Sequence, residues 1–483
     1  MTAIAAIVLA AGKGTRMKSE RAKVLHPIAW RPMLAHVLDA IAGIHASRQL
    51  VVIGHAGDSV RAACVDPAAF PGGSLELVEQ REQKGTGHAV QMTKDALATF
   101  RGTVLVMPGD VPLVRAETLA AFLQFHATAT APLSVLTTKP PDATGYGRIV
   151  RDETGTRIAR IVEHRDATAT EKLITEINTG IIAADAAFLF QALSQLRPDN
   201  SQKELYLTDV IGIAAKAGTP AGACLCEPAS EFEGINDRVQ LSRAEKALFA
   251  RVAQAHMLAG VTILDPATTR IDPRARLGVD TVLHPGVEIR GACVIGAMNV
   301  IETGTVIDES VIGAGVHVKP YCVITRARAA DGCVIGPFAH LRPEADLGES
   351  VHVGNFVEVK KTSLGKGSKA NHLAYLGDAT IGSGVNVGAG TITCNYDGFA
   401  KHPTVIEDGV FIGSDTQLVA PVKIGRDAVI GAGSTITKDV PAGSLALSRT
   451  KQTEIADYAT KRKARAEAKK ASVSGEKRKK GSQ

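Results

Sequence analysis

The chain has 483 residues, enough for at least two domains, and 45% of them are hydrophobic while only 4% are aromatic. The formal net charge is +6, but residues 450–483 hold eleven Lys and Arg against four Asp and Glu. Residues 1–449 therefore carry a charge of −1, which excludes nucleic-acid binding as the expected role of the main body. The seven cysteines are scattered without a C-x-x-C pair, an argument against a zinc site or disulfide framework and for a reducing cytoplasm.

Strand and helix signals alternate in the first part of the chain. Ile4–Ala10 is a continuous apolar run that predicts a strand buried on both faces and not a signal peptide, since it lacks a basic leader. Further strands are predicted at Leu50–Ile53, Leu75–Val78, Val104–Met107 and Leu133–Leu136, and helices at Pro32–Ile44, His88–Leu97 and Ala116–His126. This order indicates an α/β domain on a mostly parallel sheet. A helix from Arg238 to about Leu258 is the expected connector, and Gly260 ends it.

Aliphatic residues recur every six positions in the second part, with one slip of a single residue. They are Ile271, Leu277, Leu283, Ile289, Ile295, Ile301, Ile307, Ile312, Val318, Ile324, Ile335, Leu341, Leu347, Val353, Val359, Ile406, Ile412, Leu418, Ile424, Ile430 and Ile436. A period of six fits neither a helix nor a simple strand and is typical of a parallel β-helix, in which each short strand and its turn form one face of a coil. Arg326–Cys333 and Thr393–Pro403 interrupt the repeat and are predicted to be loops.

Four segments follow from these patterns: a domain over 1–237, a linker helix over 238–260, the β-helix over 261–449 and a basic tail over 450–483. The tail is predicted to be disordered or a frayed helix, solvated in preference to binding RNA or acidic lipid. No apolar run is long enough to span a membrane.

A glycine-containing turn follows the first strand. Small residues between Leu9 and Met17 let backbone N–H groups approach phosphates, and Lys13 and Arg16 add positive charge. A lone G-x-G is weak evidence, and a tight strand-to-helix turn explains it equally well. Asp110 follows a later strand at the edge where α/β sheets bind ligands, where it suits either a hard cation or a helix N-cap.

The longer string L-A-A-G-K-G-T-R-M with Lys23 resembles the signature of sugar-1-phosphate nucleotidyltransferases. That resemblance implies a Rossmann-like domain that binds UTP and Mg²⁺. Ala22 replaces a usual Pro, and Pro108 replaces a polar or aromatic residue. By the resemblance, the nucleotide and phosphates contact Leu9, Ala10, Gly12, Lys13, Gly14, Arg16, Lys23, Gln80, Gly85 and Thr86, the metal binds Asp110 and Asn236, and N-acetylglucosamine-1-phosphate contacts Gly147, Glu163 and Asn178.

Polar side chains break the aliphatic pattern of the repeats between residues 342 and 398. A lone His in such a fold is more often a surface residue, but His372 is accompanied by Tyr375, Lys360 and Arg342. With about 18 residues per coil, residues 342, 360 and 378 are predicted to stack, at the roughly 4.8 Å spacing of neighbouring strands. These side chains are therefore expected to share one pocket.

This block resembles the acetyltransferase half of the bifunctional bacterial UDP-N-acetylglucosamine pyrophosphorylase/glucosamine-1-phosphate acetyltransferases. The resemblance runs from about residue 3 to Arg449 and implies a left-handed coil, a homotrimer and a cytoplasmic enzyme that supplies cell-envelope precursors. It implies that His372 is the general base, oriented or charge-tuned by Glu358; imidazole ordinarily titrates near pH 6.5. Glucosamine-1-phosphate would contact Arg342, Lys360, Tyr375, Asn386 and Lys401, the last from a neighbouring chain, and acetyl-CoA would contact Ala389, Asn395, Tyr396, Ser414, Ala432 and Arg449.

Two other functions compete with this interpretation. One is a nucleotidyltransferase whose β-helix only regulates or trimerises, and His372, Lys360 and Asn395 argue against it. The other is a scaffold whose basic tail recruits an acidic partner, and the glycine loop and Asp110 argue against that. The expected function is acetyl transfer to glucosamine-1-phosphate followed by uridylyl transfer from UTP.

Overall fold

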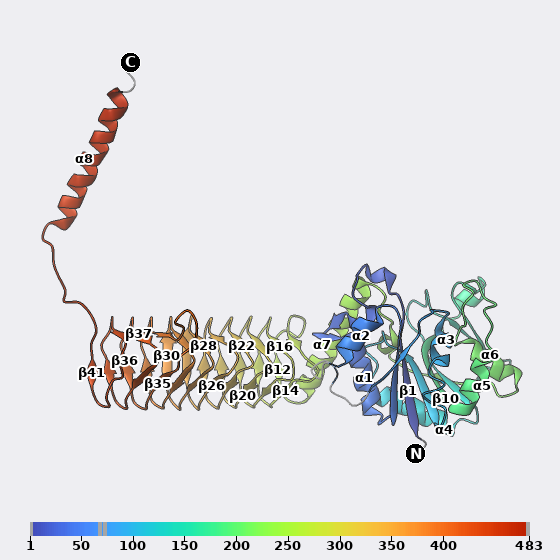
Figure 1. The fold of residues 1–483 in the computed structure, drawn as a ribbon. Helices are drawn as coiled ribbons and strands as arrows, with labels where there is room; N and C mark the ends of the chain where they lie inside the picture. Colours follow the sequence, from blue (N-terminus) through green and yellow to red (C-terminus); the bar gives the residue numbers. More distant parts are fainter. Residues whose placement is uncertain (1–2, 66–69, 71–74, 480–483) are drawn as a thin grey trace. The chain divides into compact units, whose positions relative to one another are not determined.

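A computed structural model describes residues 3–65, 70 and 75–479 of the chain. The chain divides into two compact units, Met1–Glu309 and Ser310–Gln483, called the first and second unit below. Figure 1 shows the elements of each.

The described residues of the first unit form a nine-stranded sheet in the order β5-β4-β1-β6-β10-β7-β11-β9-β8. Its strands are β1 (Ile4–Ala10), β4 (Arg48–Ile53), β5 (Glu76–Glu79), β6 (Thr103–Pro108), β7 (Leu133–Thr138), β8 (Arg148–Arg151), β9 (Arg157–Val162), β10 (Ile177–Asp185) and β11 (Ala221–Leu225). The strands β5, β4, β1 and β6 pair with one another in parallel, as predicted. The prediction that the whole sheet is mostly parallel is nevertheless wrong, because β10 runs antiparallel to β6 and β7, and β9 runs antiparallel to β8 and β11.

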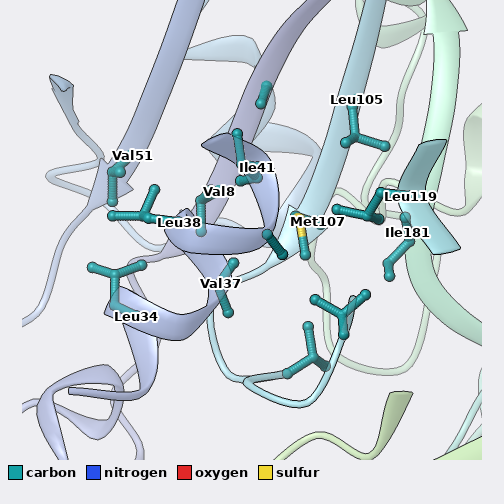
Figure 2. Packing of buried hydrophobic residues seen from close by; sticks show 14 of the residues in the cluster. Val8, Leu34, Val37, Leu38, Ile41, Val51, Leu105, Met107, Leu119 and Ile181 are labelled. Atoms are coloured by element: carbon teal, nitrogen blue, oxygen red, sulfur yellow. The ribbon is translucent and has the colours of Figure 1, made fainter. Parts of the chain in front are cut away.

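Strand β1 is apolar throughout because it contacts a core on each face. Ala6 and Val8 belong to a cluster with α1 and α4 (Figure 2), whereas Ala5 and Ile7 pack in a second cluster with α3, α5 and α6. The helices of this unit are α1 (Met33–Gly43), α2 (Gly57–Cys64), α3 (Thr86–Gln91), α4 (Ala116–Thr128), α5 (Ala186–Leu193), α6 (Asp209–Lys216) and α7 (Arg238–Leu258), with 3-10 turns η1 (Thr15–Met17), η2 (Lys23–Leu25), η3 (Glu171–Leu173) and η4 (Ala229–Phe232). Helix α3 ends six residues before the predicted Leu97, because the chain continues as tight turns in which Thr93 N donates to Val90 O.

Helix α7 begins and ends where the sequence predicts. The side chain of Asp237 caps it by accepting from the N–H groups of Val239 and Gln240 at 2.9 and 2.8 Å. Gly260 follows the helix with φ +94°, a conformation that glycine adopts readily. Leu248 and Phe249 pack in a third cluster beside the hairpin of β2 (Pro27–Ile28) and β3 (Arg31–Pro32).

The end of the first unit contains the first coils of the β-helix. Their strands are β12 (Thr262–Ile263), β13 (Arg270–Ile271), β14 (Arg276–Leu277), β15 (Val282–Leu283), β16 (Glu288–Arg290), β17 (Val294–Ile295), β18 (Val300–Ile301) and β19 (Val306–Asp308). Every third strand pairs in parallel, so that Ile271 lies opposite Ile289 and Leu283 opposite Ile301. Stacking of these buried residues is the core that the six-residue period predicts.

The second unit repeats the same parallel pairing. Its strands are β20 (Val311–Ile312), β21 (His317–Val318), β22 (Val323–Thr325), β23 (Arg328–Ala329), β24 (Val334–Ile335), β25 (His340–Leu341), β26 (Ala345–Leu347), β27 (His352–Asn355), β28 (Glu358–Lys360), β29 (Thr362–Leu364), β30 (Lys369–His372), β31 (Tyr375–Gly377), β32 (Ala379–Ile381), β33 (Asn386–Val387), β34 (Ile392–Cys394), β35 (Thr404–Ile406), β36 (Phe411–Ile412), β37 (Gln417–Val419), β38 (Val422–Ile424), β39 (Val429–Ile430), β40 (Thr435–Ile436) and β41 (Leu445–Ala446).

Three predictions for this unit are corrected. The segment Arg326–Cys333 is not a loop, because Ala329 takes the inward position between Ile312 and Leu347 and is 1% exposed. The second interruption begins at Asn395, since Thr393 lies in β34. Residues 360 and 378 do not stack, because the coils there have 17 residues and Lys360 pairs with Gly377.

The tail contains α8 (Tyr458–Lys479), whose described side chains up to Ala471 are exposed. No helix among the residues that the model describes is long and apolar enough to cross a membrane.

Candidate active sites

The first unit contains a cavity of about 760 Å³ at the carboxyl ends of β1 and β6. Most of the predicted nucleotide and sugar residues line it, as expected for the ligand-binding edge of such a sheet. The predicted residues among its lining are Leu9, Ala10, Gly12, Lys13, Arg16, Lys23, Gln80, Gly85, Thr86, Asp110, Glu163 and Asn178. Gly14, Gly147 and Asn236 lie against lining residues.

The loop after β1 is shaped by Gly14. Its φ is +58°, and a Cβ there would lie 2.7 Å from the Cβ of Lys23. A side chain at this position would therefore force the loop away from Lys23. Gly14 brings the loop and Lys23 together at one end of the cavity.

Lys23, Asp110 and Asn236 form the polar centre of that end. The ammonium of Lys23 pairs with the carboxylate of Asp110 and donates to Oδ1 of Asn236 at 3.1 Å. Arg16 Nη2 donates to the same oxygen at 2.9 Å. Carboxylate and amide oxygens thus converge on one cationic atom, and these are ligands that a hard divalent cation prefers. Asp110 and Asn236 therefore fit a divalent metal.

A second part of the cavity lies around Gln80, which is 3% exposed. Its Nε2 donates to Gly85 O at 3.0 Å. Gly85 has φ +104°, and a Cβ there would lie 2.6 Å from Leu205 O, so only glycine fits. Gln83 Nε2 donates to Ala11 O at 2.7 Å and lines the cavity. We did not predict Gln83; its only signal is a second glutamine three residues after Gln80.

The far end of the cavity contains Asn178 and Glu163. Asn178 N donates to Gly147 O, and Asn178 Oδ1 accepts from Gly180 N, both at 2.9 Å. Glu163 Oε1 accepts from the hydroxyl of Thr208 at 3.3 Å, and burial raises the pKa of Glu163. Four further lining residues that no motif indicated come from one later segment, namely Gln202, Glu204, Leu207 and Thr208.

In the second unit, His372 and Asn355 lie opposite each other on β30 and β27. Nδ1 of His372 is 2.9 Å from Oδ1 of Asn355. Glu358, which we expected to orient His372, instead accepts from Arg342 Nη1 at 2.6 Å. Asn355 was not predicted as a site residue, because its pairing with His372 depends on the 17-residue coil.

Positive charges gather around Lys360 of β28, the strand that follows β27. Lys360 and Lys401 are in contact, and the neighbouring ammonium lowers the pKa of Lys360. The charge of Arg342 also lowers the pKa of Lys360. Lys401 Nζ lies 4.0 Å from Asp378 Oδ2. Like charges held together favour a bound anion, because an anion removes their repulsion. The cluster therefore suits a phosphate group.

Asp378 is also connected to Tyr375, through Asn395. Asn395 Nδ2 donates to Asp378 Oδ2 at 2.6 Å and lies 3.4 Å from the hydroxyl of Tyr375. Asn386 lies in β33 opposite Lys369, one coil beyond β30. The polar residues thus occupy consecutive coils of the unit.

Ala389, Ser414 and Ala432 form a column of small residues along one edge of the coils. Their carbonyl oxygens accept, in turn, from Asp415 N at 2.7 Å, Gly433 N at 2.8 Å and Arg449 Nη1 at 3.0 Å. Arg449 therefore lies at the end of the column. Tyr396 is 61% exposed in the loop over 395–403, and its hydroxyl donates to Gly398 O at 2.6 Å.

Known proteins match both halves of the chain. Residues 6–204 match the family described as MobA-like NTP transferase domain, and residues 403–438 match the bacterial transferase hexapeptide (six repeats). The chain is 47% identical to Bifunctional protein GlmU of Shouchella clausii over 94% of this chain and 98% of that protein. Its identity is 49% to the GlmU of Pelobacter propionicus, with 94% and 97% covered, and 50% to that of an Anaeromyxobacter species, with 96% and 94% covered.

The chain belongs to the bifunctional GlmU family. Membership confirms the predicted fold, a nucleotidyltransferase domain followed by a left-handed β-helix of hexapeptide repeats. As a member of the GlmU family, the chain is an enzyme with a nucleotide substrate and a divalent metal.

Proposed function

We propose that the chain makes UDP-N-acetylglucosamine in two steps at two separate sites. The β-helix transfers an acetyl group from acetyl-CoA to glucosamine-1-phosphate. The first domain then joins the product to UTP and releases pyrophosphate. The observation that carries this proposal is the presence in one chain of the Lys23–Asp110–Asn236 centre and, in the β-helix, of the His372–Asn355 pair and a cluster of cations.

In the acetyl-transfer step, His372 takes a proton from the glucosamine amine. The amine nitrogen attacks the thioester carbonyl, the carbon–sulfur bond breaks, and CoA leaves as the thiol. Arg342, Lys360 and Lys401 bind the sugar phosphate, and Tyr375 and Asn386 place the sugar. Acetyl-CoA lies along the column of small residues, with Asn395 and Tyr396 beside it and Arg449 binding a CoA phosphate.

In the uridylyl-transfer step, a phosphate oxygen of N-acetylglucosamine-1-phosphate attacks the α-phosphorus of UTP. The loop after β1 binds the triphosphate, Gln80, Gly85 and Thr86 read the uracil, and Gly147, Glu163 and Asn178 place the sugar. Arg16 and Lys23 stabilise the charge that develops on the phosphates. Asp110 and Asn236 would hold Mg²⁺, which would supply further stabilisation of the negative charge on the phosphates.

We further propose that the active form is a homotrimer assembled through the β-helix, and that it acts in the cytoplasm on small-molecule substrates to feed cell-envelope synthesis. The proposed domains are residues 1–237 for uridylyl transfer and 261–449 for acetyl transfer, joined by the helix over 238–260. Residues 450–483 form a basic appendage. Sedimentation analysis of the full chain tests the trimer.

The decisive experiment measures thiol release from acetyl-CoA by the purified chain. Release that depends on glucosamine-1-phosphate, and that His372→Ala removes, is expected. UTP-dependent pyrophosphate formation in the same preparation is the control. Pyrophosphate formation without thiol release would show that the β-helix is a structural or regulatory part of a uridylyltransferase.

A further inference from the structure

Two thiols meet on β11, and neither is among the residues that line the cavity of the first unit. Cys224 lies in β11 and Cys226 directly follows it, so their side chains share one face of the strand. Their Sγ atoms are 3.7 Å apart. Cys293, Cys322 and Cys333 are buried inside the coils, while Cys64 and Cys394 are half-buried. Cys224 and Cys226 are the pair of cysteines whose sulfurs are in contact within the described residues.

The backbone holds the two cysteines in this arrangement. Cys224 pairs in register with Leu136 of β7. Beyond it, Cys226 N donates to Thr137 O at 2.9 Å, and Cys226 O accepts from the hydroxyl of Thr138 at 2.8 Å. Leu225, between them, is 46% exposed on the other face. The contact between the thiols is therefore fixed by the sheet and does not depend on a flexible loop.

We propose that Cys224 and Cys226 form a redox-active dithiol, in which Cys226 reacts with hydrogen peroxide and Cys224 converts the product to an intramolecular disulfide. The Cys226 thiolate attacks a peroxide oxygen, the O–O bond breaks, and a sulfenic acid and one water form. The Cys224 sulfur then attacks the sulfenic sulfur, an S–S bond forms, and a second water leaves. Two thiols lose two electrons, and the peroxide is reduced to two waters.

The electrostatics of the pair assign these roles. The hydrogen bond between the two sulfurs lowers the pKa of Cys226 and raises the pKa of Cys224. The thiolate is the reactive form, so Cys226 is the nucleophile. Both side chains are half-buried, which leaves part of each accessible to a small oxidant.

The distances also favour a disulfide over a metal site. A disulfide requires the sulfurs to approach to about 2.05 Å, and they already lie 3.7 Å apart on one face of the strand. A structural metal would need further ligands, and the described residues contain no group of three His, Cys, Asp or Glu able to hold an ion. The geometry of the two thiols therefore favours oxidation to a disulfide over metal binding.

The test treats the folded full-length protein with a small excess of hydrogen peroxide, blocks free thiols and maps the peptides by mass spectrometry. We expect the peptide with Cys224 and Cys226 to lose about 2 Da, the mass of two hydrogens, and dithiothreitol to restore it. In Cys224→Ser, dimedone is expected to trap a sulfenic acid on Cys226. In Cys226→Ser, Cys224 is expected to react no faster than the half-buried Cys64.

Both serine variants are expected to keep both transferase activities, and their thermal unfolding serves as the folding control. The proposal is overturned if Cys226 oxidises no faster than Cys64 in the native chain. It is also overturned if the disulfide joins either cysteine to a different cysteine or to a second chain. Neither result depends on the proposed transferase reactions.

Discussion

The imidazole of His372 faces the side-chain amide of Asn355 across two neighbouring coils, with Nδ1 and Oδ1 2.9 Å apart. An amide oxygen only accepts hydrogen bonds, so Nδ1 carries the proton and Nε2 keeps its lone pair for the substrate. An asparagine fixes this tautomer without adding negative charge beside the imidazole. Asn355 is therefore a positioning residue for the proposed base.

Replacing Asn355 by Asp or Ala separates orientation from charge. Asn355→Asp keeps an acceptor but adds a carboxylate, which stabilises the imidazolium, so the acid limb of the pH profile of kcat/KM for acetyl transfer moves to higher pH. Asn355→Ala lowers kcat by about 10- to 100-fold, part of the 10²–10⁴ that a positioned base contributes. Uridylyl transfer stays unchanged as the control. An unaltered pH profile in the Asp variant would remove Asn355 from this role.

Local patterns predict the elements of this fold but not its long-range pairing. Strand Ile4–Ala10 and helix Arg238–Leu258 have the predicted bounds, because burial on both faces and an Asp cap are visible in a short window. The antiparallel direction of β10 beside β6 cannot be predicted from a short window, since strand direction depends on how distant segments connect.

The same limit applies to the second site. Val359 and Leu364 are inward residues separated by five positions, not six, which shortens the coil to 17 residues. A search for a strict period of six passes over this step, and so pairs Lys360 with the wrong neighbour. The contact between His372 and Asn355 follows only once the shorter coil is known. The residue types therefore indicated the chemistry of the second site. Which side chains contact one another depends on the register of the coils.

Asp110 and His372 belong to different sites, so their variants are expected to have opposite effects. Asp110→Ala removes the carboxylate that would bind the metal and should abolish uridylyl transfer while leaving acetyl transfer intact. His372→Ala should lower acetyl transfer by about 10²- to 10⁴-fold and leave uridylyl transfer intact. Pyrophosphate release and thiol release from one preparation measure both. Loss of both activities in a variant with native thermal stability would contradict two independent sites.

Chelation of divalent metal should reproduce the effect of Asp110→Ala. EDTA is expected to stop pyrophosphate release and to leave thiol release unchanged, because the proposed acetyl transfer relies on His372 alone as its base. Addition of Mg²⁺ in excess should restore pyrophosphate release. Equal loss of both activities in EDTA would contradict this assignment of the metal to the first site.

Glu163 should make the stability of the first unit depend on pH. Its pKa is raised by burial, so the folded state disfavours the charged form. Below the unfolded pKa of about 4.3 the group is protonated in both states; as pH rises through the folded pKa, the cost of the buried charge appears. Glu163→Gln is therefore expected to raise the Tm near pH 7–8 and to change it little near pH 4. The KM for N-acetylglucosamine-1-phosphate should rise. An equal change in Tm at both pH values would exclude the titration of Glu163 as its cause.

Arg449 lies at the end of the column that starts at Ala389, where its Nη1 donates to Ala432 O. If it binds a CoA phosphate, Arg449→Ala removes a charge-assisted hydrogen bond of about 1.5–3 kcal/mol, and the KM for acetyl-CoA should rise by about 10- to 100-fold. Lys451→Ala is the matched control, because this exposed cation is two residues away. Equal effects of the two variants would indicate a general electrostatic attraction of CoA.

Removal of residues 452–483 should leave both activities within about twofold of the full chain. The tail contains α8, and its described side chains up to Ala471 are exposed, so little apolar surface is lost with it. The same truncation removes ten Lys and Arg against four Asp and Glu, an excess equal to the net charge of +6 of the whole chain. If the tail attracts anions, the full chain should bind vesicles of anionic lipid or RNA more strongly than the truncated chain at low salt. At physiological salt its binding should fall to the level of the truncated chain. A severe loss of either activity on truncation would show that the tail contributes to catalysis and is more than a solvated, charged end.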